Sequence, residues 1–309
     1  MQQLRQNKRR RRLKKKYAVL LVVIIFFLIF FGYGYAQYHD GKKTSEPKSE
    51  ENIRFNGEKD KNGNVNVLLL GIDKRKGETK SRTDSMMVAQ YNPDNGKVKM
   101  VSLMRDMFVP IPGYSEYKLN TAYYLGGPEL LRKTLKQEFN INIQYYVMVD
   151  FTGFEKIIDT LEPNGIEINV EKDMSKNIGV TLHEGEQKLN GKELLGYARF
   201  RHDAEGDFGR VRRQQQVLQT VADELISTNG VLKAPKLIGT IEPYIHTNIG
   251  NVDRIGLVKD FLFKHPKEIE RLTLPVANSY ENVRTVDSGL VLQIDQQKNQ
   301  QALHDFLND

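Results

Sequence analysis

The chain has 309 residues, a formal net charge of +7 and no cysteine. Nine lysine and arginine residues fall within residues 1–16, which hold no acidic residue, and the remainder carries 37 basic and 39 acidic side chains. The excess positive charge is thus confined to one end, which argues against a nucleic-acid-binding surface, and the missing cysteine excludes disulfides, thiolate nucleophiles and thiolate metal sites.

Residues 17–36 form an apolar stretch of 20 residues, long enough to cross a bilayer as a helix. The basic residues 1–16 before it are expected to stay in the cytoplasm, and Tyr33, Tyr35 and Tyr38 suit the opposite interface. A cleavable signal peptide is the alternative, but no small-x-small cleavage site follows the stretch. The sequence therefore predicts a single-pass type II protein of the cell membrane, with everything beyond the transmembrane helix extracellular.

Residues 37–63 are polar and predict a flexible extracellular stalk, followed by one folded domain at 64–309. Apolar patterning predicts strands at 65–72, 85–91, 98–104, 145–149, 166–170 and 271–276, and helices at 129–139, 151–161, 190–197, 208–227, 252–263 and 297–306. The Asn95-Gly96 pair marks a hairpin between the second and third strands. This order is typical of an α/β fold with a mixed central sheet and helices on both faces.

Two acidic residues stand at the ends of the first two predicted strands. Asp73 follows the first strand and Asp84, with Arg82, precedes the second. If these strands pair antiparallel, both carboxylates meet at one sheet end, where they are able to hold Mg²⁺ (or Mn²⁺) against phosphate oxygens. The alternative is that both are turn or capping residues.

Arg105 and Asp106 directly follow the third predicted strand. Ligands of α/β proteins gather at the carboxyl ends of strands, so this arginine is a candidate ligand-binding residue. A surface ion pair between the two residues is the alternative.

Five arginines fall within residues 199–213, in the segment Ala198-Arg-Phe-Arg-His followed by Gly209-Arg-Val-Arg-Arg-Gln. Arg199 and Arg201 point the same way only if this segment is extended, so the preceding helix is expected to end near Tyr197. Arg210, Arg213 and Gln214 share one face of the next helix. Planar guanidinium groups suit phosphate or pyrophosphate, whereas a solvated charged helix face is the alternative.

Several other chemistries lack their motifs. The six histidines, including His202, show no zinc-binding spacing, and neither a Gly-x-Ser-x-Gly elbow nor a phosphate-binding P-loop is present. The sequence gives no support for a zinc enzyme, a serine hydrolase of that type or a P-loop nucleotidase.

Taken in order behind a predicted type II anchor, these segments resemble the LytR-CpsA-Psr family of Gram-positive cell-wall enzymes over roughly residues 64–228. The motifs that carry the resemblance are Leu-Leu-Leu-Gly-Ile-Asp at 68–73, Arg-Thr-Asp-Ser at 82–85, Ser-Leu-Met-Arg-Asp at 102–106, Lys-Leu-Asn-Thr-Ala-Tyr at 118–123 and the block 189–214. One departure is the turn at 161–166, Leu-Glu-Pro-Asn-Gly-Ile, where the family more often has Gly-Gly-Val; this turn lies outside the expected site.

The resemblance implies transfer of an anionic glycopolymer, such as wall teichoic acid, from a polyprenyl pyrophosphate carrier in the membrane to a muramic acid hydroxyl of peptidoglycan. It matches Asp73 and Asp84 to magnesium-associated acids, and Arg105 and Asp106 to the catalytic center. The residues matched to pyrophosphate binding are Arg82, Arg105, Lys118, Arg199, Arg201, Arg210 and Gln214. Arginine stays protonated and is a poor general base, so that role stays open, with Asp106 or a metal-bound carboxylate as candidates.

Three other functions fit part of the pattern. Water in place of the sugar acceptor would make the chain a lipid pyrophosphatase. The basic N-terminus suggests a membrane-bound regulator, although residues 1–16 contain no helix-turn-helix pattern and no nucleic-acid partner is expected. A wall-binding module without chemistry is the last alternative. Sequence alone also does not distinguish an apolar lipid tunnel from a filled core.

Overall fold

The computed structural model describes residues 32–42, 53–73, 82–264 and 269–309. The predicted cytoplasmic segment 1–16 and most of the predicted transmembrane helix 17–36 lie outside these ranges. Within them, no helix is long and apolar enough to span a membrane.

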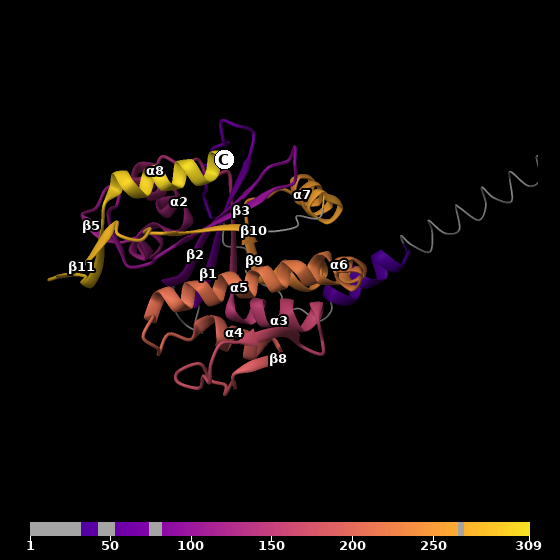
Figure 1. Ribbon diagram of the computed structural model, residues 1–309. Helices are drawn as coiled ribbons and strands as arrows, with labels where there is room; N and C mark the ends of the chain where they lie inside the picture. The colour runs from indigo at the N-terminus through magenta and orange to yellow at the C-terminus, as the bar shows by residue number, and fades with distance from the viewer. Residues whose placement is uncertain (1–31, 43–52, 74–81, 265–268) are drawn as a thin grey trace, which may run out of the picture.

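A mixed sheet forms the center of the described structure (Figure 1). Its strands, in spatial order, are β10 (Ile269–Leu274), β3 (Val98–Leu103), β2 (Arg82–Tyr91), β1 (Val65–Asp73), β6 (Tyr145–Asp150) and β9 (Ile245–Thr247). β1 runs antiparallel to β2 and parallel to β6, and the β2–β3 pair is antiparallel. This confirms the predicted mixed sheet and the hairpin, whose turn places Gly96 at a φ of 74°, a conformation that glycine adopts readily.

Two smaller sheets flank the central one. β4 (Met107–Pro110), β5 (Glu116–Lys118), β11 (Tyr280–Thr285) and β12 (Gly289–Ile294) form one, and β7 (Ile166–Val170) with β8 (Gly185–Leu189) forms the other. Apart from β7, the sequence patterning missed these strands, because they are short and several face solvent along much of their length.

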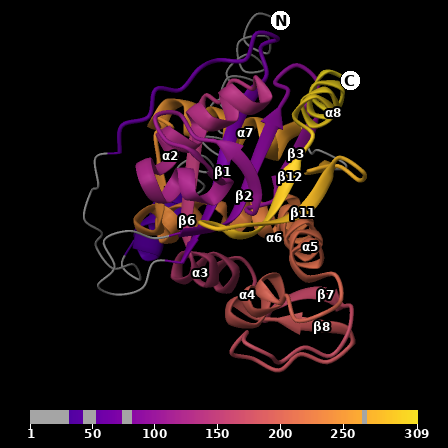
Figure 2. The ribbon, with the colours of Figure 1, turned by 90° about the vertical axis from the view of Figure 1, so that its left-hand side faces the viewer.

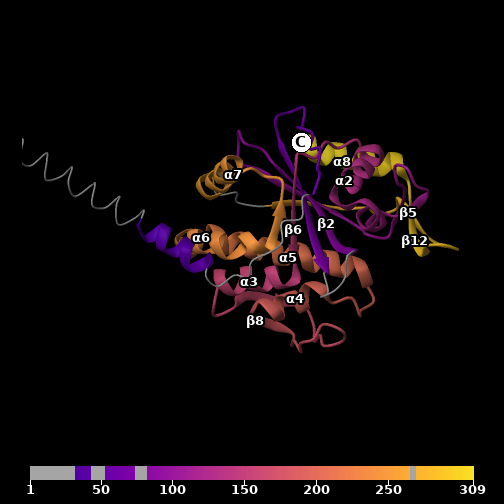
Figure 3. The same ribbon diagram turned by 180° about the vertical axis from the view of Figure 1, so that it is seen from behind.

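Helices cover both faces of the central sheet, as predicted (Figures 1 and 3). α2 (Leu119–Phe139) and α8 (Gln296–Asn308) lie on one face. α3 (Phe151–Leu161), α4 (Gly191–Arg199), α5 (Gly206–Ile226) and α6 (Thr228–Ile241) lie on the other. α7 (Asn251–Lys264) lies at the end of the sheet where β6 begins and the β2–β3 turn lies, with contacts from Asp253 to Tyr145 and from Lys264 to the Pro93 carbonyl. Figure 2 shows α3, α4 and the β7–β8 pair together below the sheet. Side-chain direction follows strand alternation: Leu68 and Leu70 enter the α2 and α8 core, whereas Leu69 faces α5.

Two departures from the predicted helices have simple causes. α2 begins ten residues before the predicted 129–139, because it contains an interruption at Gly126 and Gly127 before Pro128 restarts the helix. α4 continues to Arg199 rather than ending near Tyr197, and Phe200 then turns extended.

The segment before the domain packs on it. The Phe55 ring packs at a tilt against the Tyr146 ring, with centroids 4.9 Å apart, and Glu58 pairs with Arg132 at 2.7 Å. Residues 53–60 therefore belong to the folded unit rather than to the flexible stalk predicted for 37–63. Residues 32–42 are helical, and their Asp40 pairs with Lys236 of α6 at 2.9 Å.

Candidate functional site

The polar end of the site is built where β1 ends and β2 begins. Their antiparallel pairing places Asp73 opposite Arg82, and a bulge after Gly71 leaves Asp84 without a direct partner in the register. The Thr83 hydroxyl, which is fully buried, lies 2.9 Å from the carbonyl oxygens of Gly71 and Ser85 and stabilises this bulge. Bulges change where a side chain points, and here the extra residue is a carboxylate at a sheet end.

A cavity of about 400 Å³ lies between this part of the sheet and helices α3, α4 and α5. Most of its wall is apolar, supplied by Leu69, Met87, Val147, Val149, Phe154, Ile157, Leu195, Val217, Leu218 and Val221. The polar lining consists mainly of Asp84, Arg105, Lys176, Asn177, Arg199, Arg201, His202, Arg210 and Gln214. The cavity therefore combines a long apolar wall with a cationic region, which suits an amphipathic anion.

Arg105 is held by carboxylates from separate elements. One of its terminal nitrogens lies 2.5 Å from Asp84 Oδ1, the other lies 3.5 Å from Asp207 Oδ1, and its Nε lies 3.6 Å from Asp106 Oδ2. Burial acts to lower the pKa of Arg105, but the nearby charges of Asp207, Asp84 and Asp106 outweigh it and raise the pKa. Arg105 is therefore a fixed, fully charged cation at the cavity.

Arg210 is 4% exposed and pairs with Asp207 at 2.8 Å. Burial lowers its pKa, with Arg105 and Arg201 lowering it further against the opposing effect of Asp207 and Asp84. Its Nε and that of Arg105 are buried and have no hydrogen-bond acceptor in the described residues. Guanidinium groups are thus crowded here with unused donors, and a bound anion would relieve both conditions.

The other predicted binding residues come from α4 and α5. The capping box of Asn190 and Glu193 begins α4, whose last residue, Arg199, lies with its guanidinium 4.4 Å from the center of the Phe151 ring. Gln214 donates a hydrogen bond of 3.4 Å to the Ala198 carbonyl and so connects α5 to the end of α4. The structure brings these two residues together with Arg105, Arg201 and Arg210 around one cavity.

Two predicted residues lie away from the cavity lining. Lys118 Nζ is 2.7 Å from Asp106 Oδ1, and neither residue lines the cavity. The predicted pyrophosphate contact of Lys118 and catalytic contact of Asp106 therefore have no support from this geometry. Through its contact with Arg105, Asp106 is instead placed to hold that guanidinium in position.

The predicted metal acids are only partly described. Asp73 and Arg82 are placed by their backbone, and their side chains lie outside the description. In the described part of the chain, no group of three or more histidine or carboxylate side chains is close enough to hold a metal ion. Asp84 supplies one oxygen donor at the cavity, and Asp73 lies in the neighbouring strand at the same sheet end, so the donor chemistry fits a hard cation.

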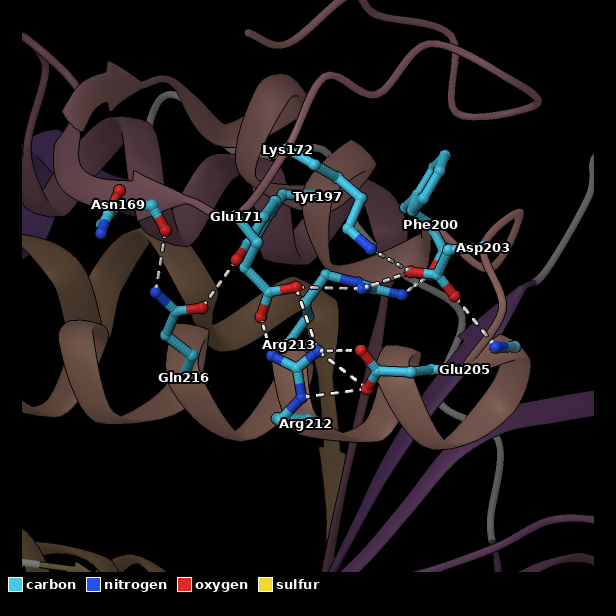
Figure 4. Close-up of polar contacts among 11 residues, drawn as sticks. Asn169, Glu171, Lys172, Tyr197, Phe200, Asp203, Glu205, Arg212, Arg213 and Gln216 are labelled. Atoms are coloured by element: carbon cyan, nitrogen blue, oxygen red, sulfur yellow. Dashed lines mark hydrogen bonds and ion pairs between the residues drawn. The ribbon is translucent and has the colours of Figure 1, made fainter. Parts of the chain in front are cut away.

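The arginines of α5 divide between two environments, and Figure 4 shows the one that surrounds Arg212 and Arg213. Arg213 is fully buried and bonds Asp203 at 2.9 Å, Glu171 at 3.2 Å and the Phe200 carbonyl at 2.8 Å. Its neighbour Arg212 pairs with Glu171 and Glu205. The expectation that Arg213 shares a binding face with Arg210 and Gln214 is therefore wrong, because acids outside the helix draw its side chain to another side.

Sequence reasoning missed several lining residues. His202 contacts Asn177 at 2.7 Å, and both line the cavity together with Lys176. The loop containing Lys176 and Asn177 carries no motif that points to this position. His202 was considered only as a metal ligand, although its place next to Arg201 offered a signal. Asp207 was also missed, although it sits in the first turn of α5, between two arginines that it helps to organise.

Known proteins resemble this chain over most of its length. A protein named regulatory protein MsrR from Staphylococcus aureus (strain COL) is 52% identical over 278 residues, which cover 90% of this chain and 83% of that protein. The polyisoprenyl-teichoic acid--peptidoglycan teichoic acid transferase TagV of Bacillus subtilis (strain 168) is 33% identical over 226 residues, or 69% of this chain and 57% of TagV. A solved structure of TagT bound to LI-WTA has a TM-score of 0.64 and 28% identity, covering 85% of this chain and 96% of that one.

The family model described as the LytR_cpsA_psr family matches residues 28–303, which include every element that lines the cavity. The match extends well beyond residue 228, where the resemblance of the motifs ends. The chain therefore belongs to the LytR-CpsA-Psr family.

Proposed function

We propose that this chain is a phosphotransferase that moves an anionic glycopolymer, such as wall teichoic acid, from a polyprenyl pyrophosphate carrier to peptidoglycan. The observation that carries the proposal is the cavity itself, in which an apolar wall ends at crowded arginines with unused donors. A polyprenyl tail would occupy the apolar part, and the pyrophosphate would lie among the guanidinium groups.

The chemistry follows from that placement. A muramic acid hydroxyl oxygen attacks the phosphorus attached to the glycopolymer, a new P–O bond forms, and the bond between the two phosphates breaks. Polyprenyl phosphate leaves with the electron pair, and the hydroxyl proton passes to a base. Arg105, Arg199, Arg201 and Arg210 would orient the pyrophosphate and stabilise the charge that develops on its oxygens.

The base is not an arginine, since guanidinium groups remain protonated. Asp106 lies behind Arg105, and two carboxylates line the cavity, Asp84 and Asp150. Asp150 caps α3 by accepting from the Gly153 backbone N–H at 2.7 Å, so Asp84 is the better candidate. Asp84 and Asp73 would also hold Mg²⁺ (or Mn²⁺), which would neutralise phosphate charge when bound. Asp84 contacts Arg105 directly, so the same carboxylate also fixes the cation that faces the pyrophosphate.

The relatives support this proposal to different degrees. TagV is named as a teichoic acid transferase, and the structure of TagT was solved with LI-WTA bound. Both statements concern those relatives. The more identical S. aureus relative carries the name regulatory protein, which favours a second candidate, a membrane-bound regulator without chemistry. A regulator of that kind gives no reason for an apolar cavity that ends in a cluster of guanidinium groups.

The proposed location is the outer side of the cell membrane, with a single type II anchor at 17–36. The apolar stretch with its basic N-terminal flank supports it. Protease added to intact cells should degrade the folded domain and leave residues 1–16 protected. Protection of the whole chain would reject this topology.

The activity test supplies full-length protein with a lipid-linked, pyrophosphate-bearing oligosaccharide, Mg²⁺ and peptidoglycan fragments. We expect a joined glycan product from the wild type and its loss in Arg105→Ala and Arg201→Ala. Arg284→Ala is the matched control, because Arg284 is an exposed arginine on β11 outside the cavity lining. Release of free sugar phosphate without joining would indicate the pyrophosphatase alternative, and no turnover with tight lipid binding would favour the regulator.

A further inference from the structure

A second hollow of about 570 Å³ lies on the opposite face of the central sheet, at the other end of β1 and β2. Its wall is formed by Asn66 on β1, Gln90 on β2, the end of α2 and the solvent-facing part of α8. It shares no lining residue with the arginine-bearing cavity. We call this hollow the amide groove, because more than half of its lining residues are asparagine or glutamine.

A buried pair of carboxamides lies in the lining of the amide groove. Asn66 and Gln90 are direct cross-strand partners and are 1% and 5% exposed. The next pair on the same face is Leu68 and Val88, which belong to the apolar core. Buried positions on this face of the sheet are normally apolar, but here Asn66 and Gln90 occupy two of them.

The hydrogen-bonding capacity of this pair is only partly used. Asn66 donates from Nδ2 to the Asn142 carbonyl at 2.8 Å, but its Oδ1 is buried and has no donor among the described residues. Leaving a buried acceptor unsatisfied is unfavourable, and such groups are normally met by ordered water or a ligand. The groove thus contains an acceptor prepared for a partner from outside the protein.

Two of the charged groups in the lining, Lys136 and Asp60, have hydrogen-bond partners within the groove, and Lys61 lies exposed at its rim. Lys136 Nζ donates to Asn142 Oδ1 at 2.5 Å, and Asp60 Oδ2 accepts from the backbone N–H of Asn62 at 2.9 Å. The remaining surface offers mainly carboxamides, each with both donors and acceptors and no net charge. A polyanion would find no arginine in this lining, in contrast to the cavity on the other face.

A peptide fits this geometry poorly. β1 and β2 are interior strands, each paired on both sides, so no free strand edge is offered for a peptide backbone to extend. Phe139 and Leu303, the apolar residues beneath the amides, are each 3% exposed and leave no pocket for an apolar side chain. Hydroxyl and acetamido groups, which donate and accept in alternation, match the carboxamide lining better.

We propose that the amide groove binds an uncharged glycan rich in hydroxyl and acetamido groups. Binding there does not rest on the transfer reaction, although peptidoglycan, the proposed acceptor, contains N-acetylated sugars of this chemical class. The groove would hold such a strand on the face away from the lipid-binding cavity, so that one polymer contacts the protein at two places.

The test titrates the full-length protein with the tetramer of N-acetylglucosamine and follows binding by saturation-transfer NMR and calorimetry. The test variant is Gln297→Ala/Gln300→Ala, because both residues line the groove on α8 and alanine maintains helix propensity. The matched control is Gln137→Ala, an exposed glutamine on α2 outside the lining. Losing one neutral hydrogen bond corresponds to about fivefold in affinity, so the double variant should bind at least about fivefold more weakly.

Saturable tetramer binding that weakens in the double variant and is unchanged in Gln137→Ala supports the proposal. Absence of saturable binding, or equal binding in the wild type and the double variant, overturns it. Binding of pentaglycine in place of the tetramer would also overturn it, because it would show a peptide site. Arg201→Ala should leave tetramer binding intact, so failure of the transfer reaction and failure of the groove are measured separately.

Discussion

Two groups of arginines around α5 have different surroundings. Arg212 and Arg213 are matched by Glu171, Asp203 and Glu205, and Arg213 is fully buried. Arg105 and Arg210 share Asp207, the charge of Arg105 lowers the pKa of Arg210, and both side chains line the cavity, which Arg212 and Arg213 do not. The comparison teaches that an arginine-rich motif does not define a binding site; the acids that other segments bring to it decide which guanidinium groups remain available.

The largest expected effect is a loss of stability when the buried Arg213, which is paired with two carboxylates, is removed. Arg213→Ala leaves Asp203 and Glu171 without their buried partner, and breaking a buried ion pair typically costs about 3–5 kcal/mol. Urea unfolding of the full-length protein measures it. A loss below about 1 kcal/mol would show that the two arginine groups do not differ as described.

Arg201→Ala should instead lower activity and leave stability nearly unchanged. Arg201 is exposed and lines the cavity, so its removal should lower glycopolymer transfer by about 100-fold, as for loss of one donor to a developing oxyanion, with little change in unfolding free energy. Transfer rates and urea curves on the same samples separate the two quantities. Normal transfer in this variant would remove Arg201 from the site.

A cavity variant sharpens the division between lipid and phosphate regions. Val221→Phe places a larger side chain in the apolar wall, and we expect KM for a long polyprenyl carrier to rise about tenfold, because a few lost methylene contacts are worth 1–3 kcal/mol. The KM for a carrier with a short tail should be nearly unchanged. Equal effects on both carriers would mean that the tail does not enter this part of the cavity.

The smallest effect concerns pH. Although burial opposes it, the charge of Arg213, together with hydrogen bonds, lowers the pKa of Asp203 below its usual 3.8. Ionised Asp203 therefore stabilises the fold above pH 3.8, and this contribution is lost as pH falls through the lowered folded-state pKa. Unfolding free energies of wild type and Asp203→Asn should differ at neutral pH and converge in acid. A constant difference across that range would contradict the assignment.

Much of the central architecture was accessible from the sequence. Long apolar segments such as 65–72 and 151–161 have a clear period, and their strands and helices lie where predicted. Arg105 was found from its position after a strand, and Arg199, Arg201 and Arg210 were found from the dense arginine motif; all four line the cavity.

The remaining features depend on tertiary contacts that no local pattern encodes. The direction of Arg213 is set by Glu171 and Asp203, which lie 42 and 10 residues away in sequence. The placement of Asp106 behind Arg105 depends on Lys118 from a short strand that the patterning missed. The amide groove joins β1 and β2 to α8 near the C-terminus, and its polar residues carry no motif.

The bulge at Asp84 has a consequence for how this protein family tolerates change. Because a strand alternates its faces, deletion of Thr83, the residue before Asp84, would restore plain pairing and place Asp84 in register opposite Ile72. Asp84 would no longer meet Arg105, whatever amino acids were retained. At this bulge the length of the strand matters more than the identity of its residues. Among family members, insertions and deletions should therefore be rarer here than substitutions.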